Sequence, residues 1–163
     1  RNIMAEKDKV NGEKQLLLQK IYIKDFSFES PGAPAIFTSK VSPQTRLDIK
    51  SSASELAPDT QEVVLSLTLE AKDQDKTLFL VEIEQAGLFR IEGYSDEEQR
   101  MLIGSYCPGT LYPFAREAIA DIVTRGGFPQ FLLQPINFDG LYAQSIKNRD
   151  DANGGSAEAR REH

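Results

Sequence analysis

Apolar and polar side chains alternate in four stretches of the first part of the chain, residues 18–29, 45–50, 62–72 and 77–91. Alternation with a period of two predicts strands with one buried and one solvent-exposed face, as in an antiparallel sheet. In the first stretch, Tyr22, Phe26 and Phe28 are expected on the buried face. The exposed face is expected to be acidic, because it would carry Asp25, Glu29, Glu62, Glu70, Glu82 and Glu84.

Helix signals follow the strands. Residues 95–98, Ser-Asp-Glu-Glu, have the form of a capping box and predict a short helix to about Tyr106. Residues 107–109, Cys-Pro-Gly, are expected to break this helix, and Thr110 is expected to cap the next one. The apolar residues of that second helix recur at helical spacing and form a stripe of Leu111, Phe114, Ala115, Ala118, Ile119, Ile122 and Val123.

Gly126 and Gly127 are expected to end the long helix, and a last helix is expected from about Asn137. Strands followed by helices predict an α+β fold, with a four-stranded antiparallel sheet followed by helices.

Residues 128–138 carry much apolar surface on backbone that cannot be regular. Pro129 and Pro135 exclude a helix interior and an inner strand. The segment is either a loop that packs on the core or the lining of an apolar groove, since contiguous exposed apolar surface marks binding sites. Residues 26–37 form a second irregular, aromatic segment, and the presence of two such segments favours a groove.

The two ends of the chain differ from the middle in composition. Residues 1–15 are polar and aperiodic, and residues 148–163 are charged, small and glycine-bearing. Both are expected to be flexible tails because they cannot bury enough apolar surface to offset ordering. Met4 is interpreted as the natural start, with residues 1–3 a remnant before it. A single domain is expected over residues 16–147.

Composition narrows the possible partners. The net charge of −6 argues against nucleic acid or an anionic membrane as the main partner. One cysteine excludes an internal disulfide and fits a reducing cytosol. No apolar run is long enough for a membrane helix or a signal peptide, so a soluble, intracellular protein is expected without membrane insertion.

Catalytic chemistry finds little support in this sequence. The one histidine, His163, is the last residue, which argues against histidine-based nucleophile systems and metal sites. Cys107 precedes a proline at the expected helix break and is interpreted as a packed, inert thiol rather than a reactive one. The acidic residues are interpreted as a solvated sheet face rather than as acids, bases or metal ligands. A small acidic enzyme would need a convergent polar pocket that the sequence does not indicate.

Several motifs resemble the protein-export chaperone family SecB. They are IYIKDFSFESPGAP at 21–34, EVVLSLTLEA at 62–71, FLVEIEQAGLF at 79–89 and CPGTLYPFAREAIADIVTRGGFPQFLLQPINFDGLY at 107–142. The resemblance covers roughly residues 16–147. It implies a homotetramer, assembled as a dimer of dimers, that keeps precursor proteins unfolded in the bacterial cytosol. The chaperone would deliver these clients to the SecA ATPase and would use no cofactor.

The resemblance also implies roles for individual residues. Those for SecA binding are Asp25, Glu29, Leu80 and Glu82. Those for subunit assembly are Val81, Ile83 and Gln85, and the long helix between the dimers adds Leu111, Phe114, Ile119 and Ile122. Those for the client groove are Phe37, Leu47, Ile49, Phe128, Phe131, Ile136, Leu141 and Tyr142.

The sequence departs from the family pattern at three places. Val81 stands where cysteine is frequent, and Gly140 stands where alanine is usual and would loosen the last helix. The C-terminal residues 158–163, EARREH, are mixed in charge, whereas this tail is acidic in some members. A SecB-like chaperone dedicated to one client, such as an antitoxin, is the alternative. It would be expected to lose the docking acids, and Asp25, Glu29 and Glu82 are present.

Overall fold

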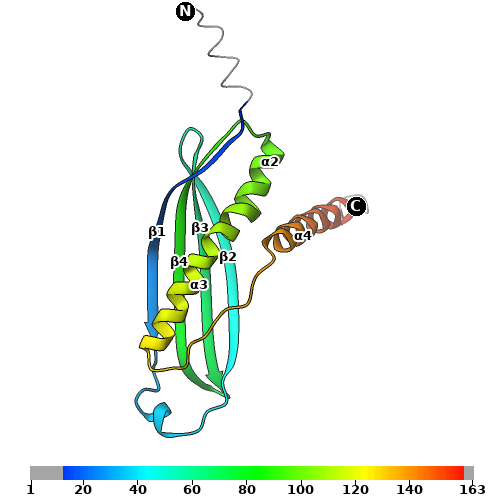
Figure 1. Ribbon diagram of the computed structural model, residues 1–163. Coiled ribbons are helices and arrows are strands. Elements are labelled where there is room, and N and C mark those ends of the chain that lie inside the picture. Colours follow the sequence, from blue (N-terminus) through cyan, green and yellow to red (C-terminus); the bar gives the residue numbers. More distant parts are fainter. Residues whose placement is uncertain (1–12, 160–163) are drawn as a thin grey trace, which may run out of the picture.

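A four-stranded antiparallel sheet forms the body of the protein, whose computed structural model describes residues 13–159 (Figure 1). The strands stand in the order β1-β4-β3-β2. Their bounds are Gln15–Glu29 for β1, Gln44–Ala57 for β2, Thr60–Asp73 for β3 and Lys76–Glu92 for β4. The alternating pattern therefore located all four strands. It underestimated β2, because residues 51–57 lack apolar alternation and yet continue to pair with β3.

The two faces of the sheet differ as the alternation predicts, with one exception. Phe26 pairs with buried Ile83 and lies on the inner face, which we define as the face covered by the long helix. A β-bulge just before Asp25 inserts an extra residue and reverses the alternation upstream of it. Tyr22 consequently lies on the opposite, outer face, where its hydroxyl donates to the Glu62 carboxylate. The expectation that Tyr22 lies on the buried face was wrong.

A short helix begins after the sheet, at a capping box. In α2 (Asp96–Met101), the Ser95 hydroxyl accepts from the Glu98 N–H, and the Glu98 carboxylate accepts from the Ser95 N–H. This reciprocal pair confirms the predicted helix start. A short 3-10 helix, η1 (Ala35–Thr38), lies earlier in the chain, in the connection from β1 to β2.

The predicted break at residues 107–109 does not occur. The π-helical segment η2 (Leu102–Tyr106) leads directly into α3 (Cys107–Arg125), and the Cys107 N–H donates to the Leu102 carbonyl. Pro108 is tolerated because it follows this widened turn at the start of α3, where a missing donor costs little. The Thr110 hydroxyl donates back to the Tyr106 carbonyl instead of capping a new helix.

Helix α3 covers the inner face of the sheet (Figure 1). Four residues of the predicted stripe are fully buried, namely Leu111, Ala115, Ile119 and Val123. They pack in one core cluster with the inner-face residues of β3 and β4, which are also almost fully buried. Ala118 and Ile122 are half-buried, and Phe114 is 45% exposed.

A Schellman-type turn ends α3. The N–H of Phe128 donates to the Val123 carbonyl, the N–H of Gly127 donates to the Thr124 carbonyl, and Gly127 adopts a φ of 89°. Residues 128–137 then follow without regular structure, as the prolines predict. The Tyr112 hydroxyl of α3 donates to the Gln134 carbonyl and so holds this segment against the helix.

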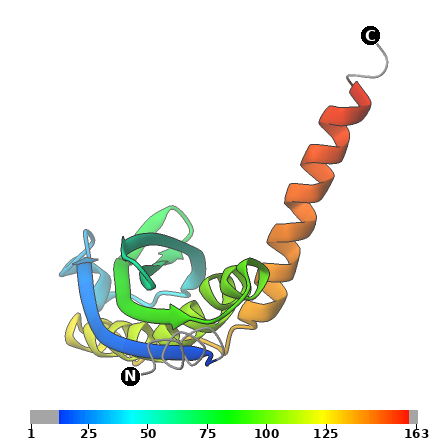
Figure 2. The same ribbon diagram turned by 90° about the horizontal axis from the view of Figure 1, so that it is seen from above.

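Helix α4 (Phe138–Ala159) projects away from the body of the molecule (Figure 2). It passes residue 147, where the sequence indicated the end of the domain, and residues 148–159 continue as part of this helix. The expectations for residues 1–12 and 160–163 lie outside the described residues. Among the described residues, no helix combines the length and the apolarity needed to span a membrane.

Candidate functional site

An aromatic cluster lies on the inner face where α3 ends. The Phe128 ring centroid is 5.0 Å from that of Phe79 and 5.4 Å from that of Phe37. Phe28 completes the cluster at 6.5 Å from Phe128. Tilted aromatic pairs at these separations attract beyond the area that they bury. Phe37 remains 50% exposed, so the cluster is packed on one side and open on the other.

Two glycines make this cluster possible. A Cβ at Gly126 would lie 2.2 Å from the Phe28 ring, and a Cβ at Gly127 would lie 3.1 Å from the Phe37 ring. Side chains at either position would push the rings apart. The same pair of glycines therefore ends α3 and admits the aromatic rings.

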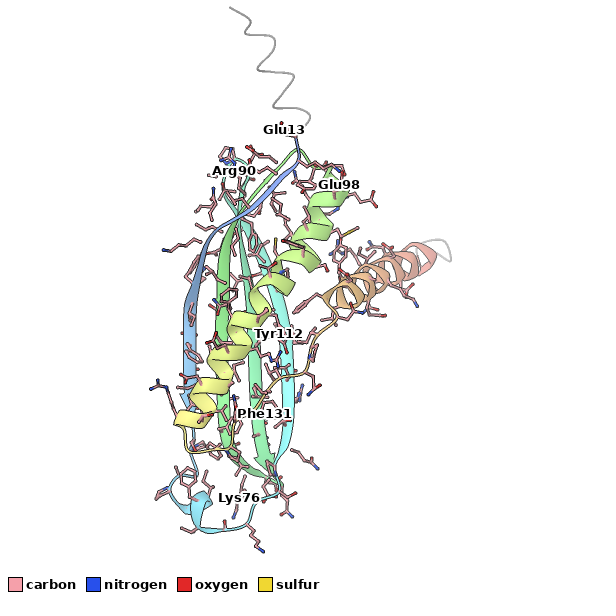
Figure 3. All side chains as sticks on the ribbon, in the orientation of Figure 1. Glu13, Lys76, Arg90, Glu98, Tyr112 and Phe131 are labelled. Atoms are coloured by element: carbon pink, nitrogen blue, oxygen red, sulfur yellow. The ribbon has the colours of Figure 1, made fainter. Side chains whose placement is uncertain are left out.

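The irregular segment after the cluster is partly core and partly surface. Leu133 is 4% exposed, whereas the neighbouring Leu132 is 53% exposed. Phe131 and Ile136 are half-buried and pack against the core cluster (Figure 3 labels Phe131). The sequence left two interpretations of this segment open, a loop packed on the core and the lining of a groove. The structure agrees in part with both, because the segment closes the core and also leaves apolar surface accessible to solvent.

A hollow of about 530 Å³ opens at the end of the inner face that lies away from the aromatic cluster, between β2, η2 and α4. We call it the upper hollow. Its lining is mostly apolar, with the large side chains of Ile49, Ile103, Phe138, Leu141 and Tyr142. Serines and two arginines complete it, namely Ser51, Ser52, Ser145, Arg100 and Arg149.

The upper hollow exists because α4 is attached to η2. A Cβ at Gly104 would lie 2.4 Å from the Tyr142 ring, so the glycine allows the ring to rest on the helix backbone. The Ser105 hydroxyl donates to the Asp139 carboxylate across the same contact. Ser105 is only 4% exposed, so this hydrogen bond is made in a largely buried setting.

The start of α4 is capped even though Gly140 lies in its first turn. The Asn137 side-chain oxygen accepts from the Gly140 N–H at 3.0 Å, which caps the helix. A Cβ at position 140 would lie 2.9 Å from the Asn137 side-chain nitrogen. The glycine therefore gives the capping side chain room.

The structure places the eight predicted groove residues on or beside the inner face, in groups. Phe37 and Phe128 belong to the aromatic cluster, and three residues line the upper hollow, namely Ile49, Leu141 and Tyr142. The other three are half-buried against the core, namely Leu47, Phe131 and Ile136.

The predicted docking residues lie together on the outer face. Glu29 of β1 pairs directly with Leu80 of β4, and Glu82 pairs with Ser27. Asp25 and Glu82 border a hollow of about 450 Å³ that Asp48 and Glu84 also line. Asp25, Glu29 and Glu82 are exposed and make no ion pair within the described part of the chain. Asp25, Glu29 and Glu82 thus lie on one surface with their charges available to a partner, whereas the Asp48 carboxylate meets Arg46 at 3.4 Å.

Glu62 on the same face is engaged within the chain. The Tyr22 hydroxyl and the Lys24 ammonium, at 2.9 Å, both donate to its carboxylate. These hydrogen bonds lower the pKa of Glu62, the one from Tyr22 most. Burial, and then the bond to Glu62, raises the pKa of Tyr22 to about 12. The charge of Glu62 is therefore compensated within the chain, as are those of Glu70, paired with Lys72 at 3.2 Å, and Asp48, paired with Arg46 at 3.4 Å.

The predicted assembly residues divide by exposure. Most of them are buried within the single chain, namely Val81, Ile83, Gln85, Leu111 and Ile119. The Gln85 side chain donates to the Tyr22 carbonyl at 3.1 Å and so ties β1 to β4. Phe114 and Ile122 alone reach the surface, and Met101 and Tyr106, each 53% exposed, add apolar area to the α2–α3 helical run.

Two features that bear on metal binding and on thiol reactivity can be read within the described residues. Burial raises the pKa of the Cys107 thiol to about 12, so it is inert at neutral pH, as the sequence indicates. No three His, Cys, Asp or Glu side chains within residues 13–154 come close enough to hold a metal ion.

The model of the family described as preprotein translocase subunit SecB matches residues 9–149. The chain belongs to the SecB family. Protein-export protein SecB of Nitrosococcus oceani is 51% identical to it over 148 residues, which cover 90% of this chain and 89% of that one. The SecB of Methylococcus capsulatus is 49% identical over 135 residues, covering 83% and 87% of the two chains.

A solved structure supports the SecB fold. The SecB-like chaperone of Mycobacterium tuberculosis, in complex with a peptide from the HigA1 antitoxin, superposes with a TM-score of 0.63. The match covers 75% of this chain and 91% of that one at 18% sequence identity, so the likeness concerns the fold alone.

Sequence reasoning missed several residues of this SecB-family site. Phe28 and Phe79 complete the aromatic cluster, and Gly104 seats the Tyr142 ring. Arg100 and Ile103 line the upper hollow from the helical run before α3. A glycine inside a helix-compatible stretch, LIGSY, was the one signal that pointed to a close approach there.

Proposed function

We propose that this chain is an export chaperone that holds unfolded precursor proteins against the inner face of its sheet. Family membership carries this proposal, together with the partly exposed apolar surface that runs from the aromatic cluster to the upper hollow. Irregular backbone between prolines presents aromatic side chains without demanding one client sequence. The working unit is residues 16–147, in the bacterial cytosol, without a cofactor and without an enzymatic reaction.

The first test compares one polypeptide in two states. Purified protein is titrated with a precursor held unfolded and with the same polypeptide in its folded form, and affinity is measured by calorimetry. A strong preference for the unfolded form is expected, because only that form offers extended apolar side chains. Equal affinity for both forms would refute the proposed function.

A double variant separates a groove role from an ordinary core role. Phe131→Ala with Ile136→Ala should weaken client binding while the assembly and the outer face stay unchanged. Both residues are half-buried, so a modest loss of stability is expected as well. The exposed Leu132→Ala is the matched control from the same segment. Unchanged client affinity, or a collapse of the melting temperature, would show that these residues serve the core.

The outer face is proposed to dock SecA through Asp25, Glu29, Leu80 and Glu82. The pairing of β1 with β4 makes them neighbours, and three unpaired carboxylates beside one apolar side chain suit a basic partner surface. Asp25→Lys with Glu29→Lys should weaken SecA binding and reduce its dependence on salt, while client affinity is retained. If both activities fell together with the fold intact, the division between the faces would be wrong.

The assembly is proposed to be a homotetramer, a dimer of dimers. The support is the apolar side of the α2–α3 helical run, where Met101, Tyr106 and Phe114 stay exposed in the single chain. Sedimentation at micromolar protein concentration should show a tetramer, and Phe114→Glu should dissociate it. A stable monomer of the unchanged chain would contradict this assembly.

A chaperone dedicated to a single client is the less favoured candidate. The structure solved with an antitoxin peptide shares only 18% identity with this chain, whereas relatives named for protein export share 51% and 49%. The acids proposed for docking are also present in this sequence.

A further inference from the structure

The β-bulge in β1 places a lysine beside the three exposed acids of the outer face. We call these acids the acidic dock, namely Asp25, Glu29 and Glu82. Ile23 and Asp25 lie opposite consecutive residues of β4, so Lys24 is the extra residue of the bulge. Regular alternation would put Lys24 and Asp25 on opposite faces. Both side chains lie on the outer face instead, because Lys24 reaches Glu62 and Asp25 borders a hollow together with Glu82.

Glu62 holds the charge of Lys24 away from the acidic dock. The Lys24 nitrogen is 2.9 Å from the Glu62 carboxylate, which belongs to β3. Glu62 lies opposite Leu88 of β4, whereas Asp25 lies opposite Glu84, so the ion pair points along the sheet away from the dock. Among the described residues no ion pair joins Lys24 to Asp25, although the two side chains are neighbours on one face.

Tyr22 fixes the Glu62 carboxylate in this position. The Tyr22 hydroxyl donates to one carboxylate oxygen, and the Lys24 ammonium donates to the other. Tyr22 lies opposite Ala86 of β4, whose small, fully buried side chain leaves room for the ring to extend toward β3. Both oxygens of Glu62 are therefore engaged from β1, and only 20% of its side-chain surface is exposed.

Asp48 shows what a neighbouring cation does to an acid of this surface. Arg46 precedes it on the same face of β2, and the guanidinium meets the Asp48 carboxylate at 3.4 Å. Asp48 borders the same hollow as Asp25, yet its charge is compensated within the chain. Lys24 stands next to Asp25 in the same way, and the difference between the two acids is that Lys24 has Glu62 as its partner.

We propose that Glu62 is a positioning residue for the acidic dock, which keeps Lys24 from covering the charge of Asp25. This inference rests on the proposed docking of SecA and adds to it a residue outside the proposed contact. An ammonium on a flexible stem pairs with the carboxylate that holds it best, so loss of the Glu62 charge turns Lys24 toward Asp25. Each dock carboxylate that is neutralised removes part of the attraction for a basic partner surface.

The test measures the affinity of the full chain for SecA by biolayer interferometry at low salt. Glu62→Gln keeps the size of the side chain and still accepts from the Tyr22 hydroxyl, but it carries no charge. Its affinity for SecA should fall about threefold, the size of an exposed ion-pair effect. Its affinity for an unfolded precursor should not change, because the inner face is untouched.

Rescue by a second change separates the positioning role from a structural one. Glu62→Gln with Lys24→Gln should regain the SecA affinity of the unchanged chain, because no lysine is left to cover Asp25. The matched control is Glu62→Gln with Lys147→Gln, which has the same net charge but loses an exposed lysine of α4, and it should stay weak. Tyr22→Phe should keep full SecA affinity, because the ion pair between Lys24 and Glu62 remains.

Four outcomes would overturn the inference. They are unchanged SecA affinity in Glu62→Gln, no rescue by Lys24→Gln, equal rescue by Lys147→Gln, and weakened SecA binding in Tyr22→Phe. The dock itself would still stand if Asp25→Lys with Glu29→Lys weakened SecA binding in the same assay, and it would be refuted if that variant kept full affinity. A changed sedimentation coefficient of Glu62→Gln would also overturn the inference, because it would assign the ion pair to the assembly.

Discussion

The two faces of the sheet are built from alternate residues of the same strands, yet side-chain packing contributes more to the stability of the inner face than to that of the outer face. The inner face is closed by α3 and by the irregular segment after it, and its ends hold the aromatic cluster and the upper hollow. The outer face carries Asp25, Glu29 and Glu82, which are exposed and make no ion pair within the described chain. The inner face should therefore respond to small changes of volume, and the outer face should respond mainly to changes of charge.

The largest effect is expected at the centre of the aromatic cluster. Phe128→Ala should lower the free energy of unfolding by about 2 to 3 kcal/mol, because a half-buried ring that touches three others is removed. Urea denaturation measures this loss. Phe37→Ala, at a site that is half exposed, should cost about 1 kcal/mol or less. Equal losses for the two variants would mean that the cluster is not organised around Phe128.

Crowding of the upper hollow should cost somewhat less. Gly104→Ala should destabilise the protein by about 1 to 2 kcal/mol, because the added methyl group overlaps the Tyr142 ring. In a Tyr142→Ala background the same change should be neutral or should stabilise by up to about 1 kcal/mol, since alanine favours a helix over glycine. The double-mutant cycle measures this reversal of sign. Independent, additive effects would show that the ring does not rest on η2.

The interactions of Glu62 on the outer face should make the free energy of unfolding depend on pH. The pKa of Glu62 lies below its ordinary value, so its contribution to stability is present above pH 4.5 and is lost as pH falls through the folded pKa. Tyr22→Phe removes the main cause of this shift. The stability difference between about pH 7 and about pH 4 should therefore shrink in the variant by about 0.5 to 1 kcal/mol.

The pKa of Tyr22 itself changes in the opposite direction. Its folded value is raised from 10.0 to about 12, so the contribution of the neutral phenol is present below pH 10 and is lost as pH approaches 12. Burial also raises the pKa of Tyr112, so spectrophotometric titration should show two phenols that ionise late, and Tyr22→Phe should remove the later of them. A wild-type pH profile in the variant would mean that the Tyr22–Glu62 contact is absent in solution.

The smallest effect on folding is expected for the unpaired acids. Asp25→Lys with Glu29→Lys should leave the free energy of unfolding within about 0.5 kcal/mol, because both side chains are exposed and make no ion pair within the described chain. Differential scanning calorimetry checks this expectation. A loss as large as that of Phe128→Ala would erase the distinction between the two faces.

Local pattern was sufficient for most of the fold. The alternation of residues 62–72 and 77–91 located β3 and β4, and the reciprocal bonds of Ser95 and Glu98 match the predicted capping box. Pro129 and Pro135 correctly indicated an irregular segment. Each of these features follows from residues that are close in sequence, which is why one sequence is enough to predict them.

Features that depend on distant contacts escaped prediction. The stretch IYIKDFSF is apolar on both sides of the bulge, so nothing marks the reversal that moves Tyr22 to the outer face. The meeting of Gly104 with Tyr142 joins positions far apart in sequence, and the upper hollow exists only through that meeting. The charged composition of residues 148–159 resembles a linker, although the chain continues as a helix there. Locating the groove residues needed a family resemblance in addition to pattern.

The π-helical turn η2 joins α2 to α3 in one continuous helical run, and it sets the rotation of α2 about the helix axis relative to α3. A π turn contains one residue more than an α turn, so the residues before it are rotated by about 100° relative to an uninterrupted helix. Loss of one residue from η2 would let the rod close into a regular α-helix and would swing Arg100 around its axis, away from α4. Chain length in this turn, rather than the identity of any lining side chain, therefore decides which side chains of α2 face the upper hollow.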